Sequence, residues 1–512
     1  MTWRAWVRPQ TILFLSLWVI LLVGGRSRFF QDPGTFWHTR VGERIYTQGF
    51  FDKDPYTFTF AGATWIPHQW LGECLMALVH AWGGLDSLLL FTTAALALLF
   101  TRLGQRLIDQ GLHPTVAIVL TALAVAASSG HFHVRPHLAT MFGMAITTIL
   151  LSDVETNRCS LNRLFWLIPI YIIWANIHGG ILGGLASLGL VFSGWIITWR
   201  LGKDSPLESS RDLLKLITIL VLCSLGCLVN PYGWRIPAVW FDIYRMEALP
   251  RMIKEHSPLN LAERNAWVVL VLGLVYLVAC LLILPTRPRI SWVLPIVWLC
   301  LSILRVRHAP LFAISAIIFL ADILPWTRVA RYWKETGSDL YTPPDPYRES
   351  IPLRVRLFAW AIPAGIFVWA ALLQFARIDL PVFGHGWAEL DAELWPVALL
   401  EPLKKHQDDR PGGTRIFNEF AYGGFLIYQT PGYRVFVDDR CELFGEAWLA
   451  MFLDAPHLDP EWSIERWQEK YGEFDLALVS TRAVPGFCQV FENSDQWVLI
   501  EKTNTASLFK RK

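Results

Sequence analysis

Charged residues are scarce in this chain of 512 residues. Only 17% of the residues are charged, whereas a soluble domain normally carries about 25%. The shortage is uneven, because long stretches hold no charge at all, among them 9–25, 267–284 and 358–373. Each is close to the roughly 17–25 residues that a membrane helix needs. One such stretch would also fit a buried core helix, but their number in one chain indicates a polytopic membrane protein.

Several other features are missing. The net charge is only +2, so no nucleic-acid partner is expected. The eight cysteines show no metal-binding spacing, and Cys223 and Cys227 lie one helical turn apart in an apolar segment, which is typical of packing. The first apolar segment ends in Val23-Gly24-Gly25-Arg26 without a small-residue cleavage site, so we expect a retained anchor.

The apolar segments predict a bundle of roughly 11–13 membrane spans. The candidates are 9–25, 70–82, 86–101, 114–129, 137–152, 164–177, 181–199, 213–229, 266–284, 291–304, 309–325 and 356–375. Lys and Arg near membrane ends favour the cytoplasm, which places the basic connections 200–215, 286–290 and 327–355 inside. The connections rich in aromatic, His and Pro residues are then outside, namely 26–69, 130–136, 178–180, 230–264 and 305–308. This alternation places the N-terminus inside and the tail after residue 376 outside, which needs an odd number of spans. Twelve spans would return both termini to the same side. We therefore expect that 70–82 is interfacial or re-entrant, or that another span is missed or merged.

The pattern changes after residue 375. Short runs broken by Gly and Pro predict strands at 415–418, 422–428 and 434–438. A charged amphipathic stretch at 461–470 predicts a helix, and 474–479 and 496–500 predict further strands. The fold class is therefore mostly α, with a transmembrane domain over 1–375 and a small outer α/β domain over 376–512. This domain contains no phosphate-binding glycine loop.

The outer loop 26–69 is the first candidate for chemistry. Asp32 comes just after the first span and precedes an amphipathic helix with Phe36, Trp37, Val41 and Ile45. Asp32 and His38 are then expected to face one cavity. The alternative is that Asp32 caps this helix and the aromatic residues anchor it at the membrane interface.

Ionisable residues also gather at the outer edges of later spans. Such groups are costly at membrane depth and usually face a polar cavity. They are His131, His133, Arg135, His137, His178, Glu255, His256, Arg305, Arg307 and His308. Arg pairs well with phosphate oxygens, so the set favours a site for a phosphate-bearing substrate, although each His alone is explained by local hydrogen bonds.

Short motifs spread over most of the chain resemble one family. They are Asp32-x5-His38-x3-Gly42, Asp54-Pro55-Tyr56-Thr57-Phe58-Thr59, Trp65-x2-His68-Gln69-Trp70-Leu71-x-Glu73, Asn176-x-His178-Gly179-Gly180, Asn230-Pro231-Tyr232-Gly233, and Asn418 through Gly423-Gly424 to Val437-Asp438-Asp439-Arg440. This pattern resembles bacterial membrane proteins related to the GT-C glycosyltransferases, relatives of the dolichyl-phosphate-mannose protein mannosyltransferases and the lipid A aminoarabinose transferase. Two departures are Gln69, where many members have Glu, and a single Asp32 followed by Pro33, where many have an acidic pair.

The resemblance implies an integral membrane glycosyltransferase that moves a sugar from a polyprenyl-phosphate donor to a glycan, lipid or protein acceptor at the outer face. Carried over, Asp32 is the general base or the acceptor-positioning group, and His38 and His68 line the donor or acceptor pocket. The residues implied to hold the phosphate are Arg135, His178, His256, Arg307 and His308. Some relatives use a divalent metal and others do not. The short loops and compact outer domain favour a bacterial inner membrane with a periplasmic C-terminal domain.

Two alternatives come from other classes. A transporter or flippase of a lipid-linked or anionic solute would need ionisable residues near the middle of its spans and usually has repeated halves. A non-catalytic receptor or assembly protein would use the outer domain and would not need Asp32. The clustering of polar residues at one face and the resemblance favour the glycosyltransferase.

Overall fold

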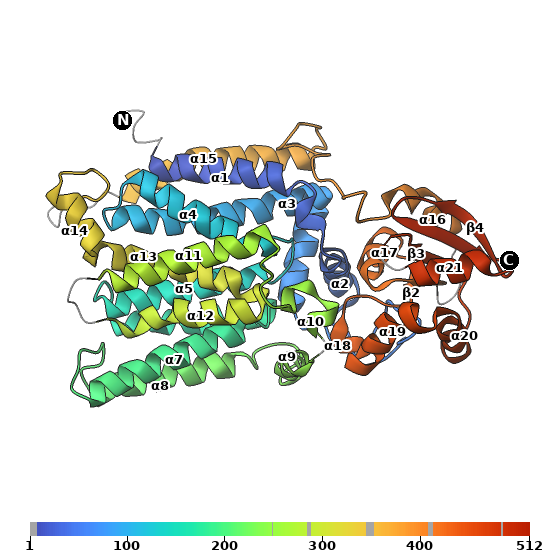
Figure 1. The fold of residues 1–512 in the computed structure, drawn as a ribbon, viewed down its shortest axis with the longest axis horizontal. Helices are drawn as coiled ribbons and strands as arrows, with labels where there is room; N and C mark the ends of the chain where they lie inside the picture. The colour runs from blue at the N-terminus through green and yellow to red at the C-terminus, as the bar shows by residue number, and fades with distance from the viewer. Residues whose placement is uncertain (1–7, 248, 284–287, 345–352, 408–412, 483–484) are drawn as a thin grey trace.

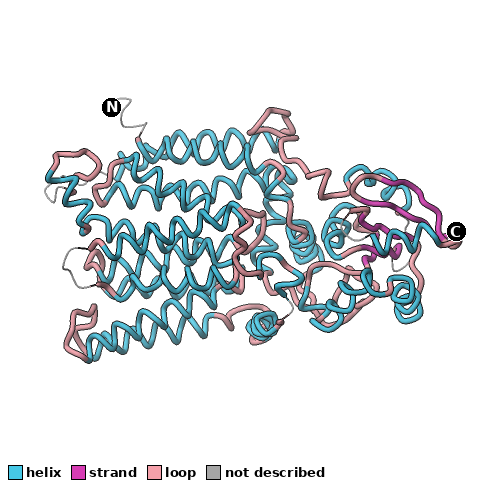
Figure 2. The backbone as a smooth tube through the Cα atoms, viewed as in Figure 1, coloured by secondary structure: helices cyan, strands magenta, loops and turns pink. Residues whose placement is uncertain are grey.

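The computed structural model describes residues 8–247, 249–283, 288–344, 353–407, 413–482 and 485–512. A bundle of helices fills one part of the molecule, and a smaller unit that contains the strands lies at one end of it (Figures 1 and 2). The long helices of the bundle are α1 Pro9–Gly25, α3 Trp70–Asp109, α4 Pro114–Ser128, α5 Leu138–Glu155, α6 Leu167–Ile177, α7 Ile181–Arg200, α8 Ser210–Gly226, α11 Arg264–Leu281, α12 Val293–Leu304, α13 Ala309–Ile323 and α15 Leu353–Phe375.

The bundle has the dimensions and composition of a membrane domain. Within the described residues, seven helices are long and apolar enough to cross a membrane, and three shorter apolar helices accompany them, Pro9–Gly25, Leu161–Ile177 and Ile290–Leu304. Helix α13 is buried along its whole length, whereas α1, α8 and α11 present many exposed apolar side chains. The chain is therefore a multi-pass membrane protein, as its charge-free stretches predicted.

The connections between helices lie at the two ends of the bundle, in the two groups that the sequence predicted (Figure 1). The start of α1, the α7–α8 connection and α14 (Arg328–Glu335) lie at the end remote from the strands. The first loop with α2 (Gly34–Gln48), and α9 (Arg235–Arg245) with α10 (Leu249–Met252), lie beside the unit that contains the strands. Parts of two basic connections, 286–287 and 345–352, fall outside the described residues.

The segments 70–82 and 86–101 meet within α3. Gly83 and Gly84 leave the helical conformation there, so two helices join at a kink between the two predicted segments. Gly84 has a φ of +67°, which a glycine adopts without strain. The two glycines therefore divide α3 where the sequence predicted a division. The two ends of the chain lie at opposite ends of the molecule (Figure 1), which agrees with an odd number of crossings.

The C-terminal unit is a five-stranded mixed sheet in the order β2-β1-β3-β5-β4, surrounded by helices. Its elements are α16 Leu400–His406, β1 Thr414–Asn418, α17 Gly423–Gln429, β2 Tyr433–Val435, α18 Cys441–Phe444, α19 Glu446–Leu458, α20 Pro460–Tyr471, β3 Leu476–Ser480, α21 Pro485–Asn493, β4 Trp497–Lys502 and β5 Ala506–Arg511. β1 is parallel to β2 and β3, whereas β5 is antiparallel to β3 and β4. The predicted α/β class is confirmed.

The predicted strand at 422–428 is instead helix α17. Phe425, Leu426 and Ile427 are all buried, and a short continuous apolar run does not distinguish a strand from a buried helix. Gly424 decides how this helix packs, because a Cβ at this position would lie 2.3 Å from the carbonyl oxygen of Pro33. The helix therefore rests directly on the backbone of the first loop.

The first loop and the sheet form one body. The backbone of Val435 in β2 exchanges hydrogen bonds with Tyr56 (3.0 Å) and Phe58 (3.1 Å), so residues 56–58 extend the edge of the sheet. Arg440 is 1% exposed, and its guanidinium lies 2.8 Å from Asp54 of the loop and 2.6 Å from Asp438. This buried ion-pair triad, called here the Arg440 triad, joins residues almost 400 positions apart in the chain.

We predict that Arg440→Met strongly destabilises the protein. The substitution leaves Asp54 and Asp438 buried without a cation, and breaking a buried ion pair in this way typically costs about 3–5 kcal/mol. Thermal unfolding of the purified protein in lipid nanodiscs should show a clearly lowered Tm, together with faster proteolysis in loop 26–69. The exposed Arg482 is the matched control, since Arg482→Met should leave both measurements unchanged. Equal Tm values for the two variants would contradict the role of the triad.

Candidate functional site

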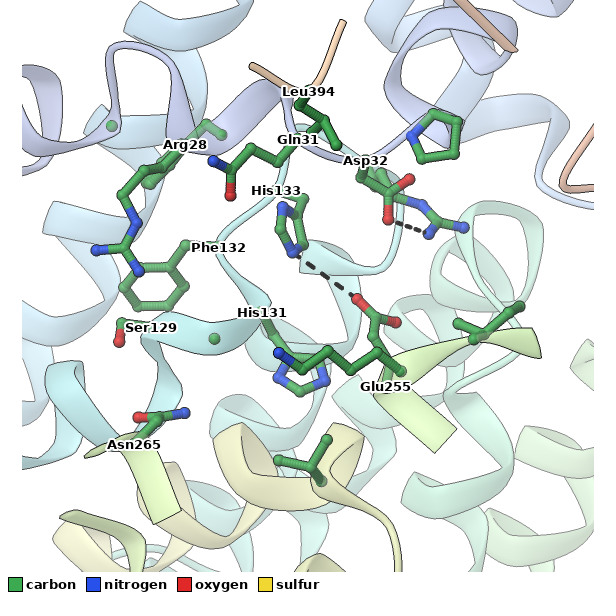
Figure 3. Close-up of a pocket in the computed structure, with 18 of the residues that line it drawn as sticks. Arg28, Gln31, Asp32, Ser129, His131, Phe132, His133, Glu255, Asn265 and Leu394 are labelled. Carbon is green, nitrogen blue, oxygen red and sulfur yellow. Dashed lines mark hydrogen bonds and ion pairs between the residues drawn. The ribbon is translucent and has the colours of Figure 1, made fainter. Parts of the chain in front are cut away.

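A cavity of about 740 Å³ lies where the bundle meets the C-terminal unit. Its apolar wall includes Ile20 and Leu21 of α1 and Val125 of α4. Its lining also holds a cluster of ionisable residues, called here the polar end, made up of Asp32, His131, His133, Arg135, Glu255 and Asp439. Arg28 and Lys254 line the cavity as well, and Arg28 lies apart from Asp32 and Glu255 (Figure 3). Ile20 is 63% exposed, so the cavity reaches the surface of α1 that faces lipid. One side of the cavity therefore suits a hydrocarbon chain and the other suits charged groups.

Asp32 forms an ion pair with Arg135 at the polar end. The Asp32 Oδ2 lies 2.8 Å from Nη1 of Arg135, and Oδ1 accepts a hydrogen bond of 2.7 Å from the backbone N–H of Gly34. A Cβ on Gly34 would lie 2.7 Å from Asp32 and 2.9 Å from Arg135, so a glycine is needed for this approach. Asp32 thus both binds the backbone at the start of α2 and lines the cavity, which reconciles the two interpretations of its position.

The charge of Arg135 is stabilised by three carboxylates. Burial lowers the pKa of Arg135, but the neighbouring negative charges of Asp32, Glu255 and Asp439 raise it above the ordinary value. The same interactions act on Glu255, where burial raises the pKa but His131, Arg135 and His137 together hold it below the usual range. Both groups are therefore ionised at neutral pH.

His133 and Glu255 complete the polar end. Their side chains lie 3.9 Å apart, and Asp32, His133 and Glu255 point toward one another (Figure 3). Each offers one ligand atom, and these atoms lie within 4.8 Å of one another. Carboxylate oxygens with an imidazole nitrogen suit a divalent transition metal. The three residues thus fit a cation, which would share Asp32 with Arg135.

Comparisons with known proteins give a fold but no family. Neither protein-family models nor curated proteins match the sequence. Among solved structures, the chain is similar to an oligosaccharyltransferase of Archaeoglobus fulgidus tethered to an acceptor peptide (TM-score 0.54, 12% identity, covering 100% of this chain and 75% of that one). The chain is also similar to the archaeal oligosaccharyltransferase AglB of that organism in complex with an inhibitory peptide and a dolichol-phosphate (TM-score 0.54, 11% identity, covering 98% of this chain and 74% of that one). It is likewise similar to the apo form of the oligosaccharyltransferase (TM-score 0.51, 11% identity, covering 92% of this chain and 69% of that one).

The chain has the fold of an archaeal oligosaccharyltransferase. This enzyme is a GT-C glycosyltransferase, so the fold implied by the sequence motifs is confirmed. In this fold the predicted site residues fall into three groups. Asp32 and Arg135 line the cavity. His256 and Arg307 are not among its lining residues but contact each other directly, next in sequence to the lining residues Glu255 and Val306. Burial, followed by the charge of Arg307, lowers the pKa of His256 to about 3, so the imidazole is neutral.

The other predicted residues lie away from the cavity lining. His38 is fully buried and contacts Glu73 through Nδ1 at 2.8 Å, and burial lowers its pKa well below the ordinary value. His68 is buried 3.8 Å from Glu442. His178 accepts a hydrogen bond of 3.0 Å from the N–H of Gly180 and contacts Thr140, and the ring of His308 lies 5.5 Å from that of Trp298. Each of these histidines thus has a local partner. This agrees with the alternative that the sequence left open, in which a histidine only satisfies local interactions.

Three further residues that line the cavity received no individual role from the family resemblance. His133 and Glu255 belong to the set of ionisable residues at the outer edges of the spans, so the sequence carried a signal for both. Asp439 comes from the C-terminal unit and stands in the motif Val437-Asp438-Asp439-Arg440. Within that motif Asp438 and Arg440 form an ion pair, and Asp439 lines the cavity.

We predict that Mn²⁺ raises the Tm of the EDTA-treated protein in nanodiscs, because a ligand that binds only the folded state stabilises it. Glu255→Gln removes a charged ligand and should abolish the increase. Glu263 lines the same cavity outside the ligand cluster, so Glu263→Gln should keep the increase. An unchanged Tm in the unsubstituted protein would indicate that Arg135 supplies the positive charge beside Asp32 without a cation.

Proposed function

We propose that this protein is an integral membrane glycosyltransferase that moves a sugar from a polyprenyl-phosphate donor to an acceptor at the outer face of the membrane. The observation that carries the proposal is the cavity, which joins a lipid-facing apolar wall to a charged end within one continuous space. A polyprenyl-phosphate sugar has the same two parts, a hydrocarbon tail and an anionic head.

The cationic residues of the cavity suit the phosphate. Arg28, Arg135 and Lys254 line the cavity, and Arg in particular pairs with phosphate oxygens through charge-assisted hydrogen bonds. The apolar residues Ile20, Leu21 and Val125 offer the tail a path toward lipid. In support, one of the similar archaeal structures contains a dolichol-phosphate and another is tethered to an acceptor peptide.

The distribution of basic connections supports an outer location. The basic connections lie at the end of the bundle remote from the cavity (Figure 1), and Lys and Arg near membrane ends favour the cytoplasm. The C-terminal unit and the cavity are then on the opposite side, which in a bacterial inner membrane is the periplasm.

Asp32 is assigned the positioning role. It fixes Arg135 through the 2.8 Å ion pair and places negative charge where the sugar and the acceptor meet. The acceptor lies between the cavity and the C-terminal unit, whose residues Phe420, Ala421 and Asp439 line the same space.

Donor cleavage by the protein in nanodiscs, over a panel of radiolabelled polyprenyl-phosphate sugars, tests this proposal. We predict transfer or hydrolysis of one sugar by the unsubstituted protein. Asp32→Asn should lower the rate about 10²-fold or more, because it releases Arg135 and misplaces the reacting groups. The control is Asp52→Asn, an exposed residue of the same loop, which should retain the full rate.

The other outcomes discriminate between classes of function. Cleavage of no donor would contradict the transferase proposal and favour the transporter. Equal rates in the Asp32→Asn and unsubstituted proteins, with matching Tm values, would remove Asp32 from the site.

A further inference from the structure

Asp439 is a second carboxylate of the cavity and comes from the far end of the chain. It follows β2 in the C-terminal unit, yet it lines the same cavity as Asp32 and Arg135. Its Oδ1 is buried and has no hydrogen-bond partner among the described residues. Asp32 differs in this respect, since Arg135 and the N–H of Gly34 occupy both of its oxygens. Of the two carboxylates, Asp439 is therefore the one that no cation and no backbone N–H holds among the described residues.

Three contacts fix Asp439 in place. Its neighbours Asp438 and Arg440 belong to the buried Arg440 triad with Asp54. Helix α17 rests on the carbonyl of Pro33 through Gly424, and the edge of β2 is hydrogen-bonded to residues 56–58. Each contact links the C-terminal unit to the loop that begins with Asp32. A reactive group held by rigid surroundings on both sides is pre-organised for chemistry.

We propose that Asp439 is the general base of the transfer reaction. This inference rests on the proposed function and adds the group that activates the acceptor. The carboxylate of Asp439 takes the proton of the acceptor hydroxyl while the hydroxyl oxygen forms a bond to the anomeric carbon of the sugar. The bond between that carbon and the phosphate oxygen breaks, and its electron pair leaves with the polyprenyl phosphate. Asp439 then releases the proton to water.

The charges around Asp439 agree with this role. Burial, followed by the negative charge of Asp32, raises the pKa of the Asp439 carboxyl to about 7, against the opposing effect of Arg135. The ionisable groups that face it are Asp32 and Arg135 from the bundle end, Asp438 from its own segment, and His133 and Glu255 across the cavity. A base whose pKa lies near the working pH combines a deprotonated state with a useful proton affinity.

The test compares steady-state kinetics of Asp439→Asn, Asp439→Glu and the unsubstituted protein in nanodiscs. We predict that Asp439→Asn lowers kcat about 10²–10⁴-fold, the usual effect of losing a general base, while the KM for the donor changes little. The kcat of the unsubstituted protein should rise with pH through about 7, because the carboxyl must lose its proton to act, and that of Asp439→Asn should not. Asp439→Glu keeps a carboxylate and should recover part of the rate.

Controls separate this inference from the proposed function. Asp495→Asn alters an exposed carboxylate of the same unit and should leave kcat unchanged, and all variants are compared by Tm. If the unsubstituted protein transfers sugar and Asp439→Asn retains its rate and pH profile, the inference is wrong and the proposed function stands.

A second measurement does not need turnover. Infrared titration should show a protonated carboxyl band that disappears with an apparent pKa near 7 and is missing from Asp439→Asn. If no donor is cleaved, the proposed function fails, and this band still decides whether Asp439 takes up a proton near neutral pH. Absence of any band removed by Asp439→Asn would overturn the inference.

Discussion

The Arg440 triad is the interaction on which the arrangement of the whole outer end depends. A guanidinium buried at 1% exposure is stable only while both carboxylates, Asp54 and Asp438, surround it. One carboxylate belongs to the first loop and the other to the C-terminal unit. The triad therefore fixes the position of the first loop relative to the C-terminal unit. The hydrogen bonds between Val435 and residues 56–58, and the contact of Gly424 with Pro33, require that same relative position. The cavity is therefore closed on one side by a unit that lies more than 300 residues away in the chain.

The charges of the cavity are arranged around Arg135. Three carboxylates raise its pKa, while Arg28 and Lys254 place further positive charge on the lining of the same cavity. Under the proposed function, these cations suit the anionic head group of the donor, and the carboxylates that could accept or position a proton lie in the same cavity. Burial of Arg135, Glu255 and Asp439 strengthens each of these interactions, since the surrounding protein screens charge less than bulk water does. Under the proposed function, the apolar wall suits the hydrocarbon tail of the donor and the charged end suits its phosphate.

The sequence predicted what depends on local composition. The membrane helices could be predicted because a continuous apolar run of sufficient length is typical of a span. Asp32 and Arg135 could be predicted because ionisable residues at the ends of such runs usually face a polar cavity. Contacts between distant segments could not be predicted from the sequence. For this reason the position of Asp439 in the cavity and the pairing of His133 with Glu255 were missed. The helix at Gly423–Gln429 was mistaken for a strand because its short apolar run shows neither a helical nor a strand periodicity. Its close packing through Gly424 on the carbonyl of Pro33 is a contact between distant segments. Several predicted histidines, such as His38 with Glu73, proved to have buried partners of their own, which a sequence does not reveal.

A base supplied by the C-terminal unit divides the reaction between the two parts of the protein. Under the proposed function, the bundle offers the donor its apolar path and its cations, whereas the C-terminal unit offers the acceptor the carboxylate of Asp439. Donor binding would then need only the bundle and the first loop, but transfer would need both parts in register. The Arg440 triad fixes the C-terminal unit on the first loop, and so it holds Asp439 and Asp32 on the lining of one cavity. The reaction therefore depends on this buried ion pair as well as on the reactive groups themselves.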